Sequence, residues 1–448
     1  MPDILDSHTS TAVSEARLKL ANCLWEITSP QTILAASSSG AQERLQRLLE
    51  RYRTLLASLG LLEALAAVER SQSLFARFML VHAPFEFLLA QLDEDPRRER
   101  EDHDYLEERV KLMCLAPCWA SGVPVTIALR KRFLLKPVPI NYTNLILDLR
   151  EYPRDEFVLT SSNGTVRFPG ESSPHDVSWD ESLCLLRFSL GHAPVLVRNP
   201  AEYVVYSTQT ISESEDCLSE DSPTYELQYR GAVFEEIVKI VETAQAFIQA
   251  YQPSLLKELR FFVRAFGMDT SWEGKGAILY SSVPWQPGLV QMAPYLLGTP
   301  EGMKIEKRGD PFPAMLVAAQ IIHEGLHQKH TYLCGCEDTN SSVDDQRGFI
   351  RPEFSGVPMT STWGGNHCWN HFFSLAASVG FEILFLEYLL RTQRLRPEGQ
   401  DFFRRRLKRK RGYLLPLLVQ AELLRHYFSP EGESVLGELF RSFGYRAT

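Results

Sequence analysis

The chain has 448 residues, of which 44% are hydrophobic and 23% are charged, close to the average for soluble globular proteins. This length predicts about two or three domains, and the composition excludes collagen-like, coiled-coil and wholly disordered chains. The formal net charge of −9 argues against general nucleic-acid binding, so we expect no nucleic-acid partner.

Targeting signals and cysteine usage both point to the cytoplasm. No charge-free apolar stretch reaches the length of about eighteen residues that a membrane-spanning helix needs, so we expect no membrane partner. Residues 1–20 lack the apolar core and cleavage site of a secretory signal. The eight cysteines are spread along the chain, and the pairs Cys114–Cys118 and Cys334–Cys336 lack CxxC spacing. We therefore interpret them as reduced thiols rather than a zinc site.

The patterns indicate an α+β protein with four successive parts. Residues 1–120 form a helical N-terminal region, because leucines recur at three- and four-residue steps between Leu45 and Leu59 and a second apolar run spans Leu74–Leu92. Residues 121–210 are β-rich, with short β-branched or aromatic runs between turn residues. Residues 211–224 are acidic and serine-rich, which predicts a flexible linker or loop.

Residues 225–448 form the predicted catalytic region, with zincin-like helices and a small sheet. The helical patterns cover 225–251, Pro311–Leu333, His367–Leu390 and Asp401–Phe428. Three runs within 259–294 are expected to be strands, and the strand at 287–294 is expected to lie at a sheet edge that holds an extended peptide.

The helix Pro311–Leu333 contains an HExxH motif, His323-Glu324-Gly325-Leu326-His327. Residues four apart project from one face of a helix, so both imidazoles can bind one metal ion. Glu324 follows His323 by one residue, which turns it by about 100° around the helix and lets it act on a metal-bound oxygen or a nearby water. The pattern therefore predicts a metal centre on this helix.

The sequence leaves the third ligand open. Metzincins need glycine at 330 and histidine at 333, but this chain has His330 and Leu333. A glutamate ligand on the next helix would be Glu382 or Glu387, both surrounded by apolar residues. We prefer His367, which follows Gly364–Gly365, with His371 as the alternative.

The order of these features resembles the HExxH-type 2-oxoglutarate-dependent peptide β-hydroxylases, which modify ribosomally made precursor peptides. The similarity covers roughly residues 259–385. It implies His323, His327 and His367 as metal ligands, Fe(II), 2-oxoglutarate and O2 as cofactor and cosubstrates, and a precursor peptide as partner. The family tends to carry arginine before the downstream histidine, but residues 353–366 contain none, so Arg351 and then Arg347 become the candidates for the cosubstrate carboxylate.

The same histidines also suit a zinc metallopeptidase, in which Glu324 is the general base and zinc lowers the pKa of bound water to about 7. Residue types alone do not decide between iron and zinc.

A basic run, Arg404–Arg411, is expected to be a solvated helix face, with an anionic partner as the alternative. The peptide, the modified residue and the oligomeric state are not indicated by the sequence.

Overall fold

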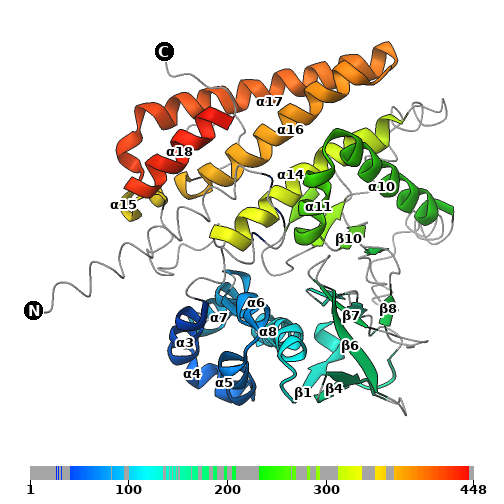
Figure 1. Ribbon diagram of the computed structural model, residues 1–448, viewed down its shortest axis with the longest axis vertical. Coiled ribbons are helices and arrows are strands. Elements are labelled where there is room, and N and C mark those ends of the chain that lie inside the picture. The colour runs from blue at the N-terminus through cyan, green and yellow to red at the C-terminus, as the bar shows by residue number, and fades with distance from the viewer. Residues whose placement is uncertain are drawn as a thin grey trace, which may run out of the picture.

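A computed structural model describes the following residues: 27, 29, 32, 41–81, 83–94, 100–134, 138–140, 142–143, 145–147, 149, 152–162, 164–169, 174–180, 185–188, 196–198, 204–207, 232–263, 265–268, 280–282, 289–292, 311–334, 349–359 and 368–442 (Figure 1). These residues have an α+β fold, as the sequence indicates. The predicted linker, 211–224, lies outside the described residues, and the division into domains stays a prediction.

The N-terminal region is helical as predicted, in more segments than the apolar patterns suggest. Its helices are α3 (Ala41–Arg51), α4 (Arg53–Ser58), α5 (Leu62–Arg70), α6 (Leu74–Val81), α7 (Ala83–Glu94) and α8 (Arg100–Ser121). The leucine stripe of 45–59 is broken at Tyr52, whose φ of −102° and ψ of 23° are not helical. The leucines on both sides still reach one core, so periodicity survives the break.

The β-rich region follows with five antiparallel strands in the order β1-β4-β5-β6-β7. They are β1 (Val125–Arg130), β4 (Glu156–Ser162), β5 (Thr165–Arg167), β6 (His175–Asp180) and β7 (Leu185–Phe188). Buried and exposed residues alternate along β1, as expected for a strand with one face on the core. The apolar runs missed β6, His-Asp-Val-Ser-Trp-Asp, which is mostly polar. A second, three-stranded sheet contains β2 (Val138–Pro139), β3 (Leu145–Leu147) and β8 (Leu196–Arg198).

A third sheet, in the order β11-β12-β10-β9, combines one strand of the predicted β-rich region with three strands of the predicted catalytic region. Its strands are β9 (Val204–Ser207), β10 (Ala265–Met268), β11 (Tyr280–Ser282) and β12 (Leu289–Met292). The predicted edge position of 287–294 is wrong, because β12 pairs with β10 on one side and with β11 on the other. The antiparallel strand β11 occupies that edge instead, and it packs against the HExxH helix.

Two helices lie between β9 and β10 in the chain: α10 (Ala232–Tyr251) and α11 (Pro253–Phe262). The second corrects a sequence prediction, because residues 259–262 end a helix rather than begin a strand. The aromatic pair Phe261–Phe262 favours a strand locally, but both residues belong to α11 and pack their side chains into the core.

The C-terminal half is built around α14 (Phe312–Cys334), which matches the predicted motif helix. It lies against α16 (Phe372–Thr392), and α17 (Pro397–Leu423) covers α16 from outside, with α18 (Pro430–Ser442) beside it (Figure 1). The short elements α15 (Pro352–Ser355), η4 (Trp369–His371) and η5 (Arg425–Tyr427) complete this part. Residues 369–392 are long and apolar enough to cross a membrane, but 78% of that window is buried inside the protein, as in a core helix.

Gly325, in the middle of the motif, lets α11 approach α14 closely. A Cβ atom at this position would lie 2.5 Å from Cδ2 of Leu259 and 3.3 Å from Cγ2 of Val263. The glycine therefore allows close packing between these two helices. This packing places the rest of the motif in the interior.

We expect Gly325→Ala to lower the free energy of unfolding by about 1–2 kcal/mol, because the leucine must move and the tight packing outweighs the helix propensity of alanine. Gly412→Ala is the matched control, since that glycine also lies in a helix but has no atom within 4 Å of the added carbon. It should stabilise the protein by about 0.5–1 kcal/mol. Urea unfolding of both variants measures these free energies of unfolding. Equal changes in the two variants would contradict the packing role of Gly325.

Candidate metal centre

The two histidines of the motif point their Nε2 atoms at each other. The Nε2 atoms of His323 and His327 are 3.2 Å apart, and the ring planes are inclined by 75°. Two bonds of about 2.1 Å from these nitrogens to one ion would enclose an angle of about 100°, between the octahedral and tetrahedral values. The distance between the two nitrogens is therefore compatible with a shared metal ion, once the proton of their hydrogen bond has left, as the four-residue spacing predicts.

The other nitrogen of each ring lies close to a polar side chain of α16. Nδ1 of His327 lies 2.7 Å from Oγ of Ser374, and Nδ1 of His323 lies 2.9 Å from Oε2 of Glu382. Metal-binding histidines usually have such partners, which fix the ring and leave Nε2 free to bind the ion. Since the later residue on α16 meets the earlier histidine, the two helices run antiparallel.

Glu382 is a fully buried carboxylate between α14 and α17. Nε of Arg406 donates to its Oε1 at 2.7 Å, and Nζ of Lys410 lies 2.6 Å from its Oε2. Burial acts to raise the pKa of Glu382, but the charges of Arg406 and Lys410 outweigh it and hold the pKa well below its usual range. The carboxylate beside His323 is therefore ionised.

His323 is held in the neutral form that binds metal. Burial, followed by the charge of Lys410, lowers its pKa to about 4, although Glu382 acts in the opposite direction. With the proton of His323 on Nδ1, facing the carboxylate, its Nε2 presents a lone pair. His327 can share a proton with that lone pair, and an ion that binds both nitrogens would displace this proton.

The predicted third ligand and one predicted arginine lie outside the described residues: His367 and Arg347. The chain on both sides of 360–367 is anchored, because Pro358 forms a bridge with Cys368 and the Trp369 amide donates to the Val357 carbonyl at 3.0 Å. His371 is half-buried at the start of α16, one turn before Ser374. The choice between His367 and His371 stays a prediction.

Glu324 and Arg351 are described, and their proposed roles stay predictions. Glu324 is buried on α14, and its charge acts on Lys410. Arg351 precedes α15, and its Nε donates to the Phe428 carbonyl at 2.9 Å. This contact ties Arg351 to the junction of η5 and α18.

Neither glutamate on α16 is placed as a direct ligand. Glu382 contacts Nδ1 of His323, the nitrogen opposite the one that faces His327, and both of its oxygens already contact cations. Glu387 pairs with Arg411 at 2.5 Å, where both side chains are partly exposed. The glutamate ligand set that the sequence left open is thus not supported by the described residues.

Sequence reasoning missed four side chains around the motif histidines: Ser374, Glu382 as a partner of His323, and the buried cations Arg406 and Lys410 of α17. The prediction of a solvated face for Arg404–Arg411 is wrong for Arg406 and Lys410, which are 13% and 7% exposed at the side chain. The signal was present, because these two cations are four residues apart and can share one helix face. The spacing alone does not show whether that face points to the solvent or to another helix.

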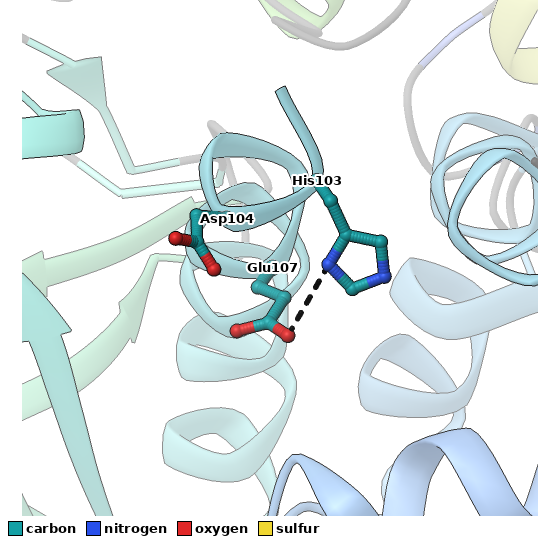
Figure 2. A group of neighbouring side chains, drawn as sticks. All are labelled: His103, Asp104 and Glu107. Carbon is teal, nitrogen blue, oxygen red and sulfur yellow. Dashed lines mark ion pairs between the residues drawn. The ribbon is translucent and has the colours of Figure 1, made fainter. Parts of the chain in front are cut away.

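A second group of possible ligand atoms lies in the N-terminal region, on α8: His103, Asp104 and Glu107 (Figure 2). Nδ1 of His103 is 3.5 Å from Glu107, and Arg130 of β1 binds Asp104 at 3.1 Å and Glu107 at 2.8 Å. The guanidinium of Arg130 already pairs with both carboxylates, so we interpret the group as an ion-pair network that joins α8 to β1.

Cys114 and Cys118 are buried free thiols on α8. Burial raises the pKa of Cys118 to about 12 and raises that of Cys114 as well. Their interpretation as reduced thiols stays a prediction.

Comparison of the chain with models of known protein families gives no match, and comparison with curated proteins gives none either.

Replacing Glu382 tests whether the buried ion cluster supports the histidines. We expect Glu382→Gln to lower the free energy of unfolding by about 3–5 kcal/mol, because it leaves the charges of Arg406 and Lys410 buried without their anion. Where the variant folds, its affinity for a divalent ion should fall about 10–100-fold.

Glu387→Gln is the matched control, because it removes the other Glu–Arg pair between the same helices at the surface. It should cost at most about 1 kcal/mol and leave metal affinity unchanged. Denaturant unfolding and metal titration of the two variants separate the cases, and similar losses in both would contradict the role of Glu382.

Proposed function

We propose that the chain is an Fe(II)- and 2-oxoglutarate-dependent oxygenase that hydroxylates the β-carbon of a side chain in a ribosomally made precursor peptide. The metal-dependent part of the proposal is supported by the two Nε2 atoms, which lie 3.2 Å apart, and by the polar side chain of α16 that lies next to each Nδ1. The resemblance described above supports the choice of iron, 2-oxoglutarate and O2. We place this activity in the cytoplasm.

The ligand set favours this proposal over the common zinc peptidases. Metzincins are excluded by His330 and Leu333, and a glutamate ligand is disfavoured by the engagement of Glu382 with His323, Arg406 and Lys410. We propose a third histidine as the remaining ligand, His367 with His371 as the alternative. Three imidazoles suit iron as well as zinc.

Each named residue has a defined task in the proposed reaction. His323 and His327 bind the ion as neutral imidazoles, and Glu382 and Ser374 keep their rings oriented. Glu324 would act on an oxygen near the ion, and Arg351 or Arg347 would bind the distal carboxylate of 2-oxoglutarate through a planar guanidinium. Bound iron with 2-oxoglutarate and O2 supplies the oxidation that places a hydroxyl group on an unactivated carbon.

The strand β11 is our candidate for peptide binding. Among the described residues, β11 pairs with β12 alone and packs against α14. An extended peptide can add to such an edge through backbone hydrogen bonds, which would bring its side chains near the motif helix. This replaces the assignment of the edge to residues 287–294.

A zinc metallopeptidase is the second candidate, and the position of Glu324 favours it. This glutamate is buried one residue after a candidate ligand, where a general base is needed for peptide hydrolysis. Both candidates require the same two histidines.

The decisive measurement is metal analysis of anaerobically purified protein, followed by intact-mass analysis of a precursor peptide encoded nearby. We expect iron to be required, 2-oxoglutarate and O2 to be consumed, and the peptide to gain about 16 Da through one added oxygen atom. Cleavage of the peptide that needs zinc alone would support the peptidase and overturn the hydroxylase.

Histidine variants connect this chemistry to the site. His323→Ala and His327→Ala should each abolish stoichiometric metal binding, because each removes one of two convergent ligands. His426→Ala is the control, since His426 is exposed on η5 and stacks edge-on against Phe354 and Tyr427. If His323→Ala retains full metal binding and activity, the protein acts by a mechanism that does not use this site.

A further inference from the structure

The outer face of α17 carries an apolar stripe: Leu415, Val419 and Leu423. Their exposed fractions are 51%, 44% and 74%, and they are the exposed large hydrophobic side chains found among the described residues. They recur every four residues, so they form one ridge along the C-terminal half of an outermost helix (Figure 1). Scattered apolar residues are common on surfaces, but a contiguous stripe marks a contact site.

The charges around the stripe differ between its two ends. Toward the start of α17 lie the exposed cations Arg404, Arg405, Lys408, Arg409 and Arg411, of which Arg405 pairs with Asp401 and Arg411 with Glu387. At the other end, where α17 passes into η5 and α18, lie Glu422, Glu431 and Glu433, and Arg425 pairs with Glu422 and feels the charge of Glu433. One end is therefore basic and the other acidic.

We propose that this stripe is a self-association surface, on which α17 of a second copy of the chain packs antiparallel about a twofold axis near Val419. In a twofold contact the same patch faces itself, so Leu415 of one copy meets Leu423 of the other. A convex helical ridge fits the grooves beside the same ridge of a second helix. This inference does not depend on the proposed function.

The charge pattern fits the antiparallel arrangement. At about 1.5 Å per residue, Lys408 lies about 16 Å from Val419 along the helix, whereas Leu423 lies only about 6 Å away. The basic end of one copy therefore extends past the end of α17 in the other, to the acidic junction with α18. Opposite charges then meet at both ends of the contact, and we assign Lys408 to the vicinity of Glu433.

Two other occupants fit less well. An anionic membrane would be attracted by the basic end but repelled at the apolar end, where Glu422, Glu431 and Glu433 lie. An amphipathic peptide needs a groove, and the described stripe is a ridge on a single helix. The self-complementary pattern favours a second copy.

The test is sedimentation equilibrium of the full chain over a range of concentrations. The wild type should show a monomer–dimer equilibrium, and Leu423→Glu should weaken dimerisation at least about tenfold, because it places a charge against the apolar side chain of Leu415 in the other copy. The side chain is 74% exposed, so the fold should be unaffected, which circular dichroism and thermal unfolding check.

A charge exchange tests the orientation. Lys408→Glu should weaken the dimer, and the double variant Lys408→Glu/Glu433→Lys should restore it, which a loss of folding would not explain. Gly437→Ala is the control. This glycine lies on α18, as Glu433 does, and an added carbon there meets no atom within 4 Å. A wild type that stays monomeric at all concentrations, or a Leu423→Glu variant that dimerises unchanged, would overturn the proposal, as would cosedimentation of the monomer with anionic vesicles.

Discussion

One buried carboxylate connects the helices of the candidate site. Glu382 lies on α16, contacts His323 of α14 through one oxygen, and binds Arg406 and Lys410 of α17. A lone buried carboxylate would be strongly unfavourable, and so would two buried cations, but together their opposite charges offset part of this cost. The geometry of the motif thus depends on a helix that contributes none of its histidines.

This arrangement explains why a basic run lies on a helix far along the chain from the motif. Arg406 and Lys410 are buried on the inner side of α17, whereas Arg404, Arg405 and Lys408 are exposed on its outer side. The inner cations fix Glu382, and the outer ones give the helix a basic surface beside its apolar stripe. One sequence feature therefore has two physical roles that depend on helix orientation.

The close packing of α11 on α14 makes a similar point about the motif itself. Gly325 occupies the third position of HExxH, where its missing side chain leaves room for Leu259. A position that the metal does not need is thereby constrained by helix packing. The two ligand positions and the packing position lie on different faces of one helix, so one short sequence meets both requirements.

The sequence by itself determined the helix that bears the motif, the convergence of His323 and His327, the change from helices to strands after Ser121 and the α+β class. These follow from local periodicity, because residues four apart on a helix are neighbours whatever surrounds them. Only the tertiary structure decided that Glu382 supports His323, that Ser374 faces His327 and that β11 rather than β12 lies at the sheet edge. The two contacts of the motif histidines join residues about fifty or more positions apart in the chain. No local pattern indicates which face of one helix packs against which face of another.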